Sequence, residues 1–158
     1  MDLLYRIMDK FRREFWRLRH PQIWGRNLQV NGIPIITGYK KLLLGKNVSV
    51  NDDVFLQTAG YVKIGDNVTI SRGCTILTTG LDTSDYIAGC KEKLRPHIVK
   101  DVYIGKGAWL AANVIVTPGA YIPEGAIIAA GSIVVGRLEE KYAIYVGGPA
   151  VLKKKLNA

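Results

Sequence analysis

Large aliphatic side chains recur every six residues along most of this chain, and this spacing constrains the fold more than any other feature. Stepping by six from Ile98 reaches Val134 without a miss, and small or slim residues recur four places after these positions. Upstream, the same spacing runs from Leu44 to Ile76, with two extra residues after Leu56. Neither a helical period of about 3.6 nor a strand period of about 2 explains it. The aliphatic positions are Leu44, Val50, Leu56, Ile64, Ile70, Ile76, Ile98, Ile104, Leu110, Val116, Ile122, Ile128 and Val134.

A period of six is typical of a parallel β-helix built from hexapeptides. Each hexapeptide contributes a short strand and a corner, and three of them close one triangular coil, with the aliphatic side chain pointing inward. The corners need tight or left-handed backbone, and residues suited to it stand at 45–47 (GKN), 65–67 (GDN) and 118–119 (PG). We therefore predict an all-β solenoid rather than a helical fold.

The run 108–131, AWLAANVIVTPGAYIPEGAIIAAG, carries one charge, Glu124, and is apolar enough to suggest a membrane span. Pro118 and Pro123 lie inside it, together with glycines, and a membrane helix rarely accepts them without compensation. The six-residue period continues through the run, so we interpret it as the wall of the solenoid.

Four segments lie outside the period. Residues 77–97 interrupt it, and we predict that they leave one corner of the solenoid as an excursion loop and return at its end. The expected organisation is an N-terminal basic amphipathic helix at 1–20, a connector at 21–43, the hexapeptide β-helix at 44–135 and a closing segment at 136–158.

The first segment has helical periodicity. Five apolar residues fall on one stripe at steps of four and three, with basic residues on both borders of the stripe. Two interpretations stay open: residues 3–19 contact a membrane surface peripherally, or the stripe packs on the solenoid or on a second copy of the chain. The stripe consists of Leu4, Met8, Phe11, Phe15 and Leu18.

Composition narrows the possible partners. The chain has 22 Lys and Arg against 13 Asp and Glu, a formal charge of +9 that favours anionic partners. We expect no nucleic-acid partner, because the basic residues gather at the ends of the chain without interleaved aromatic residues. Cys74 and Cys90 are too few for a disulfide framework, and we expect reduced thiols in a cytoplasmic protein, with peripheral contact at the inner membrane face as a further option.

Four short segments carry a resemblance: Trp109 to Asn113, Pro118 to Gly119, Ala129 to Ser132 and Gly147 to Ala150. In this order they resemble the hexapeptide-repeat acyltransferases, in particular the sugar O-acetyltransferase group. The resemblance implies a left-handed parallel β-helix and a homotrimer, with acetyl-CoA lying in the groove between two subunits and no metal. It also implies direct transfer of the acetyl group, in a ternary complex, to a hydroxyl of a sugar or polysaccharide precursor.

The resemblance carries over to the site with one departure. Relatives place a catalytic histidine after Thr-Gly at the start of the excursion, where this chain has Leu81. A leucine cannot take a proton, so we predict that His97, at the end of the excursion, is the general base. Asp82 and Asp85 are predicted to orient this histidine or bind the acceptor, and Glu92 is a further candidate for orienting it.

Gln57 stands where relatives carry an asparagine that binds the acceptor, and it keeps both amide functions. The resemblance assigns coenzyme A contacts to Ala112 and Ala130, where small side chains let the pantetheine arm lie along the backbone. It assigns a phosphate contact to Lys154. Trp109 is a further candidate for a cofactor contact, or else a packing residue of its turn.

Two other functions compete with this prediction. Leu81 favours a catalytically inactive trimeric solenoid that serves as a binding or scaffold protein, in which His97 is a surface residue of the loop. A zinc enzyme built on the same solenoid would need three histidines per site, whereas this chain has only His20 and His97.

Overall fold

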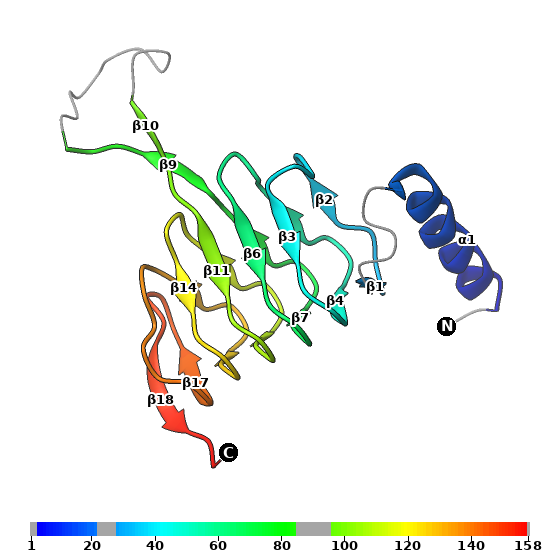
Figure 1. Cartoon of the computed structure of the whole chain (residues 1–158). Helices are drawn as coiled ribbons and strands as arrows, with labels where there is room; N and C mark the ends of the chain where they lie inside the picture. Colours follow the sequence, from blue (N-terminus) through cyan, green and yellow to red (C-terminus); the bar gives the residue numbers. More distant parts are fainter. Residues whose placement is uncertain (1–2, 22–27, 85–95, 158) are drawn as a thin grey trace.

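The computed structural model describes residues 3–21, 28–84 and 96–157, and it shows a helix followed by a parallel β-solenoid (Figure 1). Short strands stack into three sheets, which form the three walls of the solenoid. Sheet A contains β1 (Leu28–Val30), β4 (Val48–Val50), β7 (Thr69–Ile70), β12 (Trp109–Leu110), β15 (Ile127–Ile128), β17 (Ala143–Val146) and β18 (Val151–Lys155). Sheet B contains β2 (Ile35–Ile36), β5 (Phe55–Leu56), β8 (Thr75–Ile76), β13 (Ile115–Val116) and β16 (Ile133–Val134). Sheet C contains β3 (Leu42–Leu44), β6 (Val62–Ile64), β11 (Val102–Ile104) and β14 (Tyr121–Ile122).

The predicted fold class, a left-handed parallel β-helix with an N-terminal helix and one excursion, is confirmed. Coils stack in register, so that Ile104 pairs with Ile122 and Leu110 pairs with Ile128. Successive side chains of a strand point to opposite faces, and the aliphatic positions of the period therefore point inward. The buried core includes Leu56, Ile70, Ile76, Ile104, Leu110, Val116, Ile122, Ile128 and Val134.

The corner between sheets A and B repeats one backbone conformation in successive coils. Asp53, Gly73, Asn113 and Gly131 all have positive φ, between 58° and 73°. Only glycine, asparagine and aspartate adopt this left-handed conformation readily, which explains why these residue types recur at the corners. Backbone N–H groups of one coil donate to carbonyls of the preceding coil here, as from Gly131 to Ala112. The corners therefore extend the hydrogen-bond ladders of the strands.

The stack of coils begins earlier than the six-residue period indicates. Strands β1 and β2, inside the segment expected to be a connector, pair in parallel with β4 and β5. Val30 pairs with Val50 and Ile36 pairs with Leu56, so each partner lies twenty residues further along the chain. Because this coil has two extra residues, its strands do not fall on the six-residue spacing that starts at Leu44.

Ile98 does not take the inward solenoid position that the period assigns to it. It lies in β10 (His97–Val99), which pairs antiparallel with β9 (Thr79–Leu81) as a two-stranded ribbon projecting from the solenoid (Figure 1). Ile98 is half-buried opposite Gly80, and the stack resumes at β11. The expectation for Ile98 is wrong because the excursion ends in a ribbon rather than at the wall.

Helix α1 (Leu3–Arg19) lies beside the first coils (Figure 1). Its polar side faces them, because Arg12 and Arg13 donate to Asp52 and Asn31. Phe11, Phe15 and Leu18 are 73%, 53% and 63% exposed, so the stripe does not pack on the solenoid of its own chain, and the alternatives of a membrane surface or a second copy stay open. In the part of the chain that the structure describes, no helix is long and apolar enough to cross a membrane. The helix ends at Arg19, and Pro21 follows within two residues.

Candidate active site

The ribbon of β9 and β10 brings the predicted base close to the position it is expected to replace. His97 and Leu81 are direct cross-strand partners. The backbone N–H of Asp82 donates to the Pro96 carbonyl at 2.9 Å, so Asp82 and Pro96 form a hydrogen-bonded pair. Because such pairs alternate along an antiparallel ladder, the neighbouring Leu81 and His97 form a non-hydrogen-bonded pair. Side chains of such a pair lie on one face, with Cβ atoms about 4.5–5.5 Å apart. An imidazole therefore lies on the strand beside β9, on the same ribbon face as Leu81.

The two faces of the ribbon look toward different corners. Thr79 and Val99 share the face of Leu81 and His97, because they are two residues away along each strand. The Cγ1 atom of Val99 lies 3.1 Å from where a Cβ on Gly60 would stand. This face therefore looks toward the corner at residues 57–60.

The opposite face of the ribbon carries Gly80 and Ile98. A Cβ on Gly80 would stand 3.5 Å from Cγ of Pro118, which belongs to the following corner of the stack. His97 is exposed on the other face, which looks toward residues 57–60.

Gln57 holds the base of the ribbon. Its Oε1 atom accepts hydrogen bonds from the Thr79 hydroxyl at 2.7 Å, the Thr79 N–H at 3.0 Å and the Thr78 N–H at 3.2 Å. The buried Thr78 hydroxyl in turn donates to the Gln57 carbonyl at 2.9 Å. The side chain predicted to bind the acceptor thus fixes the strand that faces His97, and its contacts come from its oxygen end.

Asp82 makes a local turn at the tip of β9. Its carboxylate accepts hydrogen bonds from the Ser84 N–H at 3.0 Å and from the Ser84 hydroxyl. The hydroxyl bond is the main cause that lowers the pKa of Asp82, with smaller contributions from the Ser84 N–H and the charge of Lys100. Asp85 and Glu92 lie outside the described residues. The contacts of the Asp82 carboxylate are thus with Ser84, and none of them joins it to His97.

A hollow of about 540 Å³ lies at this edge of the solenoid, and the sequence pattern did not indicate it. Its lining includes Tyr39, Lys40, Lys41 and Thr58, the last of which adjoins Gln57 in the chain. The Lys41 ammonium donates to the Ala59 carbonyl at the same corner. Tyr39, Lys40 and Lys41 fall in the segment expected to be a connector. They lie beside the candidate site because the coils begin before Leu44.

Sheet A carries two of the predicted cofactor residues in one row. Trp109 pairs with Ile127, Ile127 with Ile144, and Ile144 with Lys154 across β12, β15, β17 and β18. Trp109 is 48% exposed, and its indole N–H donates to the Ser71 hydroxyl at 3.1 Å. The Trp109 ring therefore lies on the outer surface of sheet A, in the same row as Lys154.

Ala112 and Ala130 lie at the corner that follows this row, in successive coils. The Ala112 carbonyl accepts the Gly131 N–H at 2.9 Å, which places the two corners directly on each other. Ala112 is half-exposed and Ala130 is exposed. The four predicted cofactor residues thus form one continuous region over sheet A and its corner with sheet B.

One chain does not bring this region together with His97. The ribbon projects from the corner between sheets B and C, whereas Ala112 and Ala130 lie at the corner between sheets A and B. Sheet B separates the two, and its outer face carries one largely apolar row. The row consists of Ile35, Phe55, Thr75, Ile115 and Ile133.

The side chains that could bind a metal ion are dispersed over the described residues. Among the described residues, no group of three or more His, Cys, Asp or Glu side chains could hold a metal ion. Cys74 is buried in the core, and its thiol donates to the Ala111 carbonyl at 3.1 Å. Burial raises the pKa of Cys74, so this thiol is protonated at neutral pH.

Sequence comparison finds acetyltransferases among the relatives of this chain. It is 31% identical over 111 residues to a galactoside O-acetyltransferase of Lactococcus lactis subsp. lactis (strain IL1403), covering 70% of this chain and 48% of that protein. It is 31% identical over 131 residues to WcaF of Escherichia coli (strain K12), provisionally named a colanic acid biosynthesis acetyltransferase, covering 81% of this chain and 66% of WcaF. The chain therefore spans about half of the first relative. No family model matches the chain.

Solved structures confirm the fold. A maltose O-acetyltransferase from Clostridium difficile 630 superposes with a TM-score of 0.76 at 22% identity, covering 99% of this chain and 90% of that one. A hexapeptide-repeat acetyltransferase from Vibrio cholerae, crystallised with acetyl coenzyme A, superposes with a TM-score of 0.64 at 18% identity, covering 92% and 78%. The stacked hexapeptide coils, the excursion at one corner and these relatives together identify the chain as a member of the hexapeptide-repeat acyltransferase superfamily, in the group that includes the sugar O-acetyltransferases.

Proposed function

We propose that this protein is an acetyl-CoA-dependent O-acetyltransferase that acts on a hydroxyl of a sugar or polysaccharide precursor. The observation that carries the proposal is the cross-strand pair of His97 and Leu81. The pair puts an imidazole on the same ribbon face as the position where the resemblance expects the base. The names of the galactoside and colanic acid relatives support a glycan acceptor.

The proposed reaction passes the acetyl group directly from donor to acceptor in a ternary complex. His97 takes the proton of the acceptor hydroxyl as the hydroxyl oxygen attacks the thioester carbonyl. The new C–O bond forms, the C–S bond then breaks, and the imidazolium returns the proton to the departing thiolate. The products are an O-acetyl ester and coenzyme A.

We propose acetyl-CoA as co-substrate, held by the region of Trp109, Ala112, Ala130 and Lys154. The acetyl coenzyme A bound to the Vibrio cholerae neighbour supports the choice of donor. Small side chains at the corner leave the backbone open to a pantetheine arm, and the Lys154 ammonium suits a phosphate.

We further propose a homotrimer, with the cofactor in the groove between two chains. Separation of His97 from the cofactor region within one chain supports this assembly, because a neighbouring chain is then needed to complete the site. The apolar outer row of sheet B is the surface that we assign to the contact. We also propose a cytoplasmic location, which fits acetyl-CoA as the donor. Peripheral contact at the inner membrane face through residues 3–19 fits the basic helix.

Thiol release from acetyl-CoA in the presence of a panel of sugars and nucleotide sugars tests the proposal. We expect the wild-type protein to release coenzyme A with at least one acceptor, and His97→Ala to lower kcat by about 10²- to 10⁴-fold. His20→Ala is the matched control. The His20 ring stacks on Trp16 at 4.4 Å and lies 5.6 Å from the Tyr39 ring at the hollow. Because His20 does not belong to the ribbon of His97, kcat should be unchanged, and any effect should appear in KM.

A histidine exchange sharpens this test. The double variant Leu81→His/His97→Leu moves the imidazole to the opposite strand on the same face, and we expect it to recover part of the activity that His97→Ala loses. Unchanged turnover in His97→Ala would remove this residue from the mechanism. Coenzyme A binding by calorimetry without thiol release for any acceptor would instead favour the inactive scaffold, to which Leu81 points.

A further inference from the structure

We infer that the outward face of α1 is a docking surface for an anionic lipid bilayer. The face consists of Ile7, Met8, Phe11, Phe15 and Leu18, which are 53–73% exposed. The inference deepens the peripheral membrane contact of residues 3–19 in the proposed function, and it is separate from acetyl transfer because it requires lipid binding and no catalysis.

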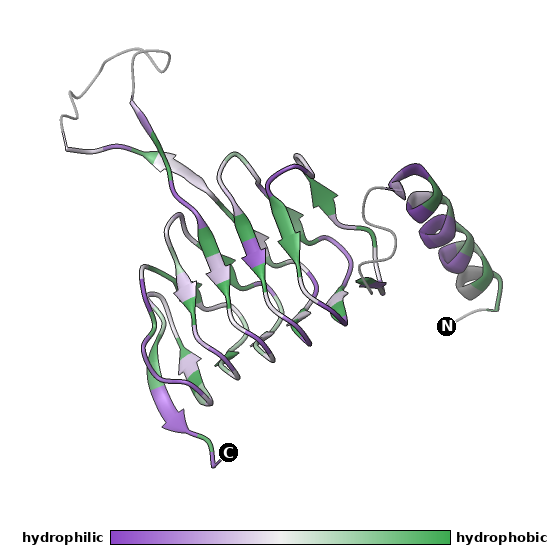
Figure 2. Ribbon diagram, in the orientation of Figure 1, coloured by the Kyte–Doolittle hydropathy of each residue, from purple (hydrophilic) through white to green (hydrophobic). Residues whose placement is uncertain are grey.

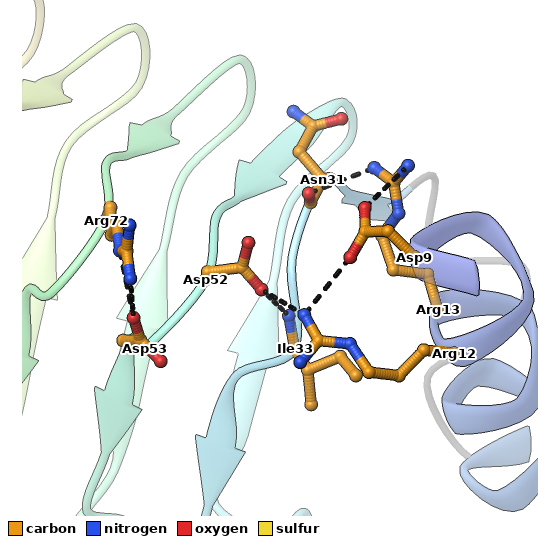
Figure 3. Close-up of polar contacts among 8 residues, drawn as sticks. All are labelled: Asp9, Arg12, Arg13, Asn31, Ile33, Asp52, Asp53 and Arg72. Carbon is orange, nitrogen blue, oxygen red and sulfur yellow. Dashed lines mark hydrogen bonds and ion pairs between the residues drawn. The ribbon is translucent and has the colours of Figure 1, made fainter. Parts of the chain in front are cut away.

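Polar contacts set the orientation of the helix (Figure 3). Arg13 donates to the Asn31 carbonyl at 3.0 Å, and Arg12 donates to the Asp52 carboxylate at 3.3 Å. Asp9 binds both arginines, at 3.1 and 3.2 Å. The same Asp52 oxygen also accepts the Ile33 N–H at 2.9 Å, so the anchor is part of the first corner of the solenoid.

These anchors turn the apolar stripe away from the solenoid. At about 100° per residue, Asp9, Arg13 and Trp16 occupy one side of the helix and the stripe occupies the other. The burial agrees, because Asp9, Arg13 and Trp16 are half-buried whereas the stripe is exposed. Figure 2 shows the same division, with polar residues of α1 toward the solenoid and apolar residues on the far side.

Cations border the stripe on both sides. Lys10 and Arg17 follow one border, and Arg19 follows the other, where Arg12 is instead paired with Asp9 and Asp52. The Arg19 guanidinium lies 5.7 Å from the ring centre of Phe15, so the charge sits at the edge of the apolar surface. Long basic side chains in this place can keep their charge among headgroups while the apolar side chains enter the acyl boundary.

The charge of the helix favours lipid over stripe-to-stripe packing with the helix of a second copy of the chain. Within residues 3–19, six Lys and Arg face two acidic residues, Asp9 and Glu14. Two such helices packed stripe to stripe would bring their basic borders together, and like charges at a contact disfavour association. An anionic bilayer offers both an apolar interior for the stripe and negative headgroups for its borders.

Vesicle flotation with the full chain tests the inference. We expect the protein to float with phosphatidylcholine vesicles that contain phosphatidylglycerol, and to stay behind with pure phosphatidylcholine. Phe11→Ser/Phe15→Ser should weaken the binding by about tenfold or more, because two aromatic side chains no longer enter the boundary. Tyr103→Ser is the matched control, since Tyr103 is an exposed aromatic residue on sheet C and should leave the binding unchanged.

Two further readouts make the inference falsifiable. Light scattering gives the mass of Phe11→Ser/Phe15→Ser in solution, and a fall in mass relative to wild type would show that a second copy covers the stripe and would overturn the inference. If the protein floats equally well with neutral and anionic vesicles, the basic residues that border the stripe do not select anionic lipid, and the inference is overturned. Thiol release with a soluble acceptor should be the same for this variant and wild type, which keeps lipid binding separate from catalysis.

Discussion

Gln57 contributes to the candidate site at the scale of a single side chain, by holding the start of β9. Its side-chain oxygen accepts three hydrogen bonds from Thr78 and Thr79, which lie three and two residues before Leu81. Because β10 pairs with β9, the position of His97 depends on this clamp. The residue was predicted to bind the acceptor, and the observed contacts add a positioning role to that prediction.

Two substitutions separate these roles. Gln57→Ala removes the acceptor of all three bonds, and we expect kcat to fall by about 10²-fold, the effect of a misplaced catalytic group. Gln57→Glu keeps acceptor oxygens at the same reach and should recover most of kcat. If the amide NH₂ group instead binds the acceptor, Gln57→Glu will stay impaired, with the loss appearing in KM. Steady-state kinetics for both variants distinguish the two results.

At the scale of the elements, the corners between sheets C and A show how local geometry limits the sequence. Gly107 and Gly125 occupy equivalent places in successive coils, with φ of 68° and 65°. A Cβ at Gly107 would meet nothing within 4 Å, whereas a Cβ at Gly125 would lie 2.3 Å from Cδ1 of Tyr142. The two glycines therefore share a backbone requirement and differ in the space around them.

This difference gives a matched pair of stability predictions. Gly107→Ala should lower the free energy of unfolding by about 1–2 kcal/mol, the cost of a left-handed alanine. Gly125→Ala should cost about 1–3 kcal/mol more, because the Tyr142 ring must move. Urea unfolding measures both. Equal losses for the two variants would contradict the close approach at Gly125, and Gly125→Ala/Tyr142→Ala should remove part of the excess.

The sequence predicted the elements whose residues repeat and missed those fixed by long-range pairing. Inward aliphatics such as Leu110 and Ile128 recur at a constant interval because every coil presents the same wall, so the solenoid could be predicted. Val30 and Ile36 were missed, since two extra residues take the first coil off the six-residue grid. The direction in which the apolar stripe of α1 faces could not be predicted from the sequence either, because it depends on contacts between the helix and a corner of the solenoid.

In the candidate site, too, the parts that follow the repeat could be predicted and the parts fixed by long-range pairing could not. Ala112 and Ala130 stand one coil apart, and their stacking follows from the period alone. The pairing of His97 with Leu81 depends on the register of an antiparallel ribbon that joins positions sixteen residues apart, for which the sequence has no period. The hollow at Tyr39 and Lys40 depends on the unrecognised first coil, and no local motif could have indicated it.

At the scale of the whole molecule, the two parts of the site lie on different edges, and the proposed trimer joins them. Ile115, in the outer row of sheet B, is 37% exposed, and Leu43, on sheet C, is 45% exposed. Ile115→Glu puts a charge into the proposed contact and should lower the mass in solution from three chains to one. Leu43→Glu puts the same charge on another wall and should leave the mass unchanged. Light scattering distinguishes the two, and a three-chain mass for both variants would contradict the assignment of sheet B.

Mixed oligomers then test whether the neighbouring chain completes the site. His97→Ala removes the base, and Ala130→Trp fills the corner assigned to the pantetheine arm, so each variant alone should release little coenzyme A. In a cyclic trimer that contains both, one interface pairs an intact His97 with an intact Ala130 from the next chain. Co-expression should therefore restore part of the activity, whereas mixing the two purified proteins without subunit exchange should not. Failure of the co-expressed pair to regain activity would mean that each chain uses its own His97 and Ala130 together.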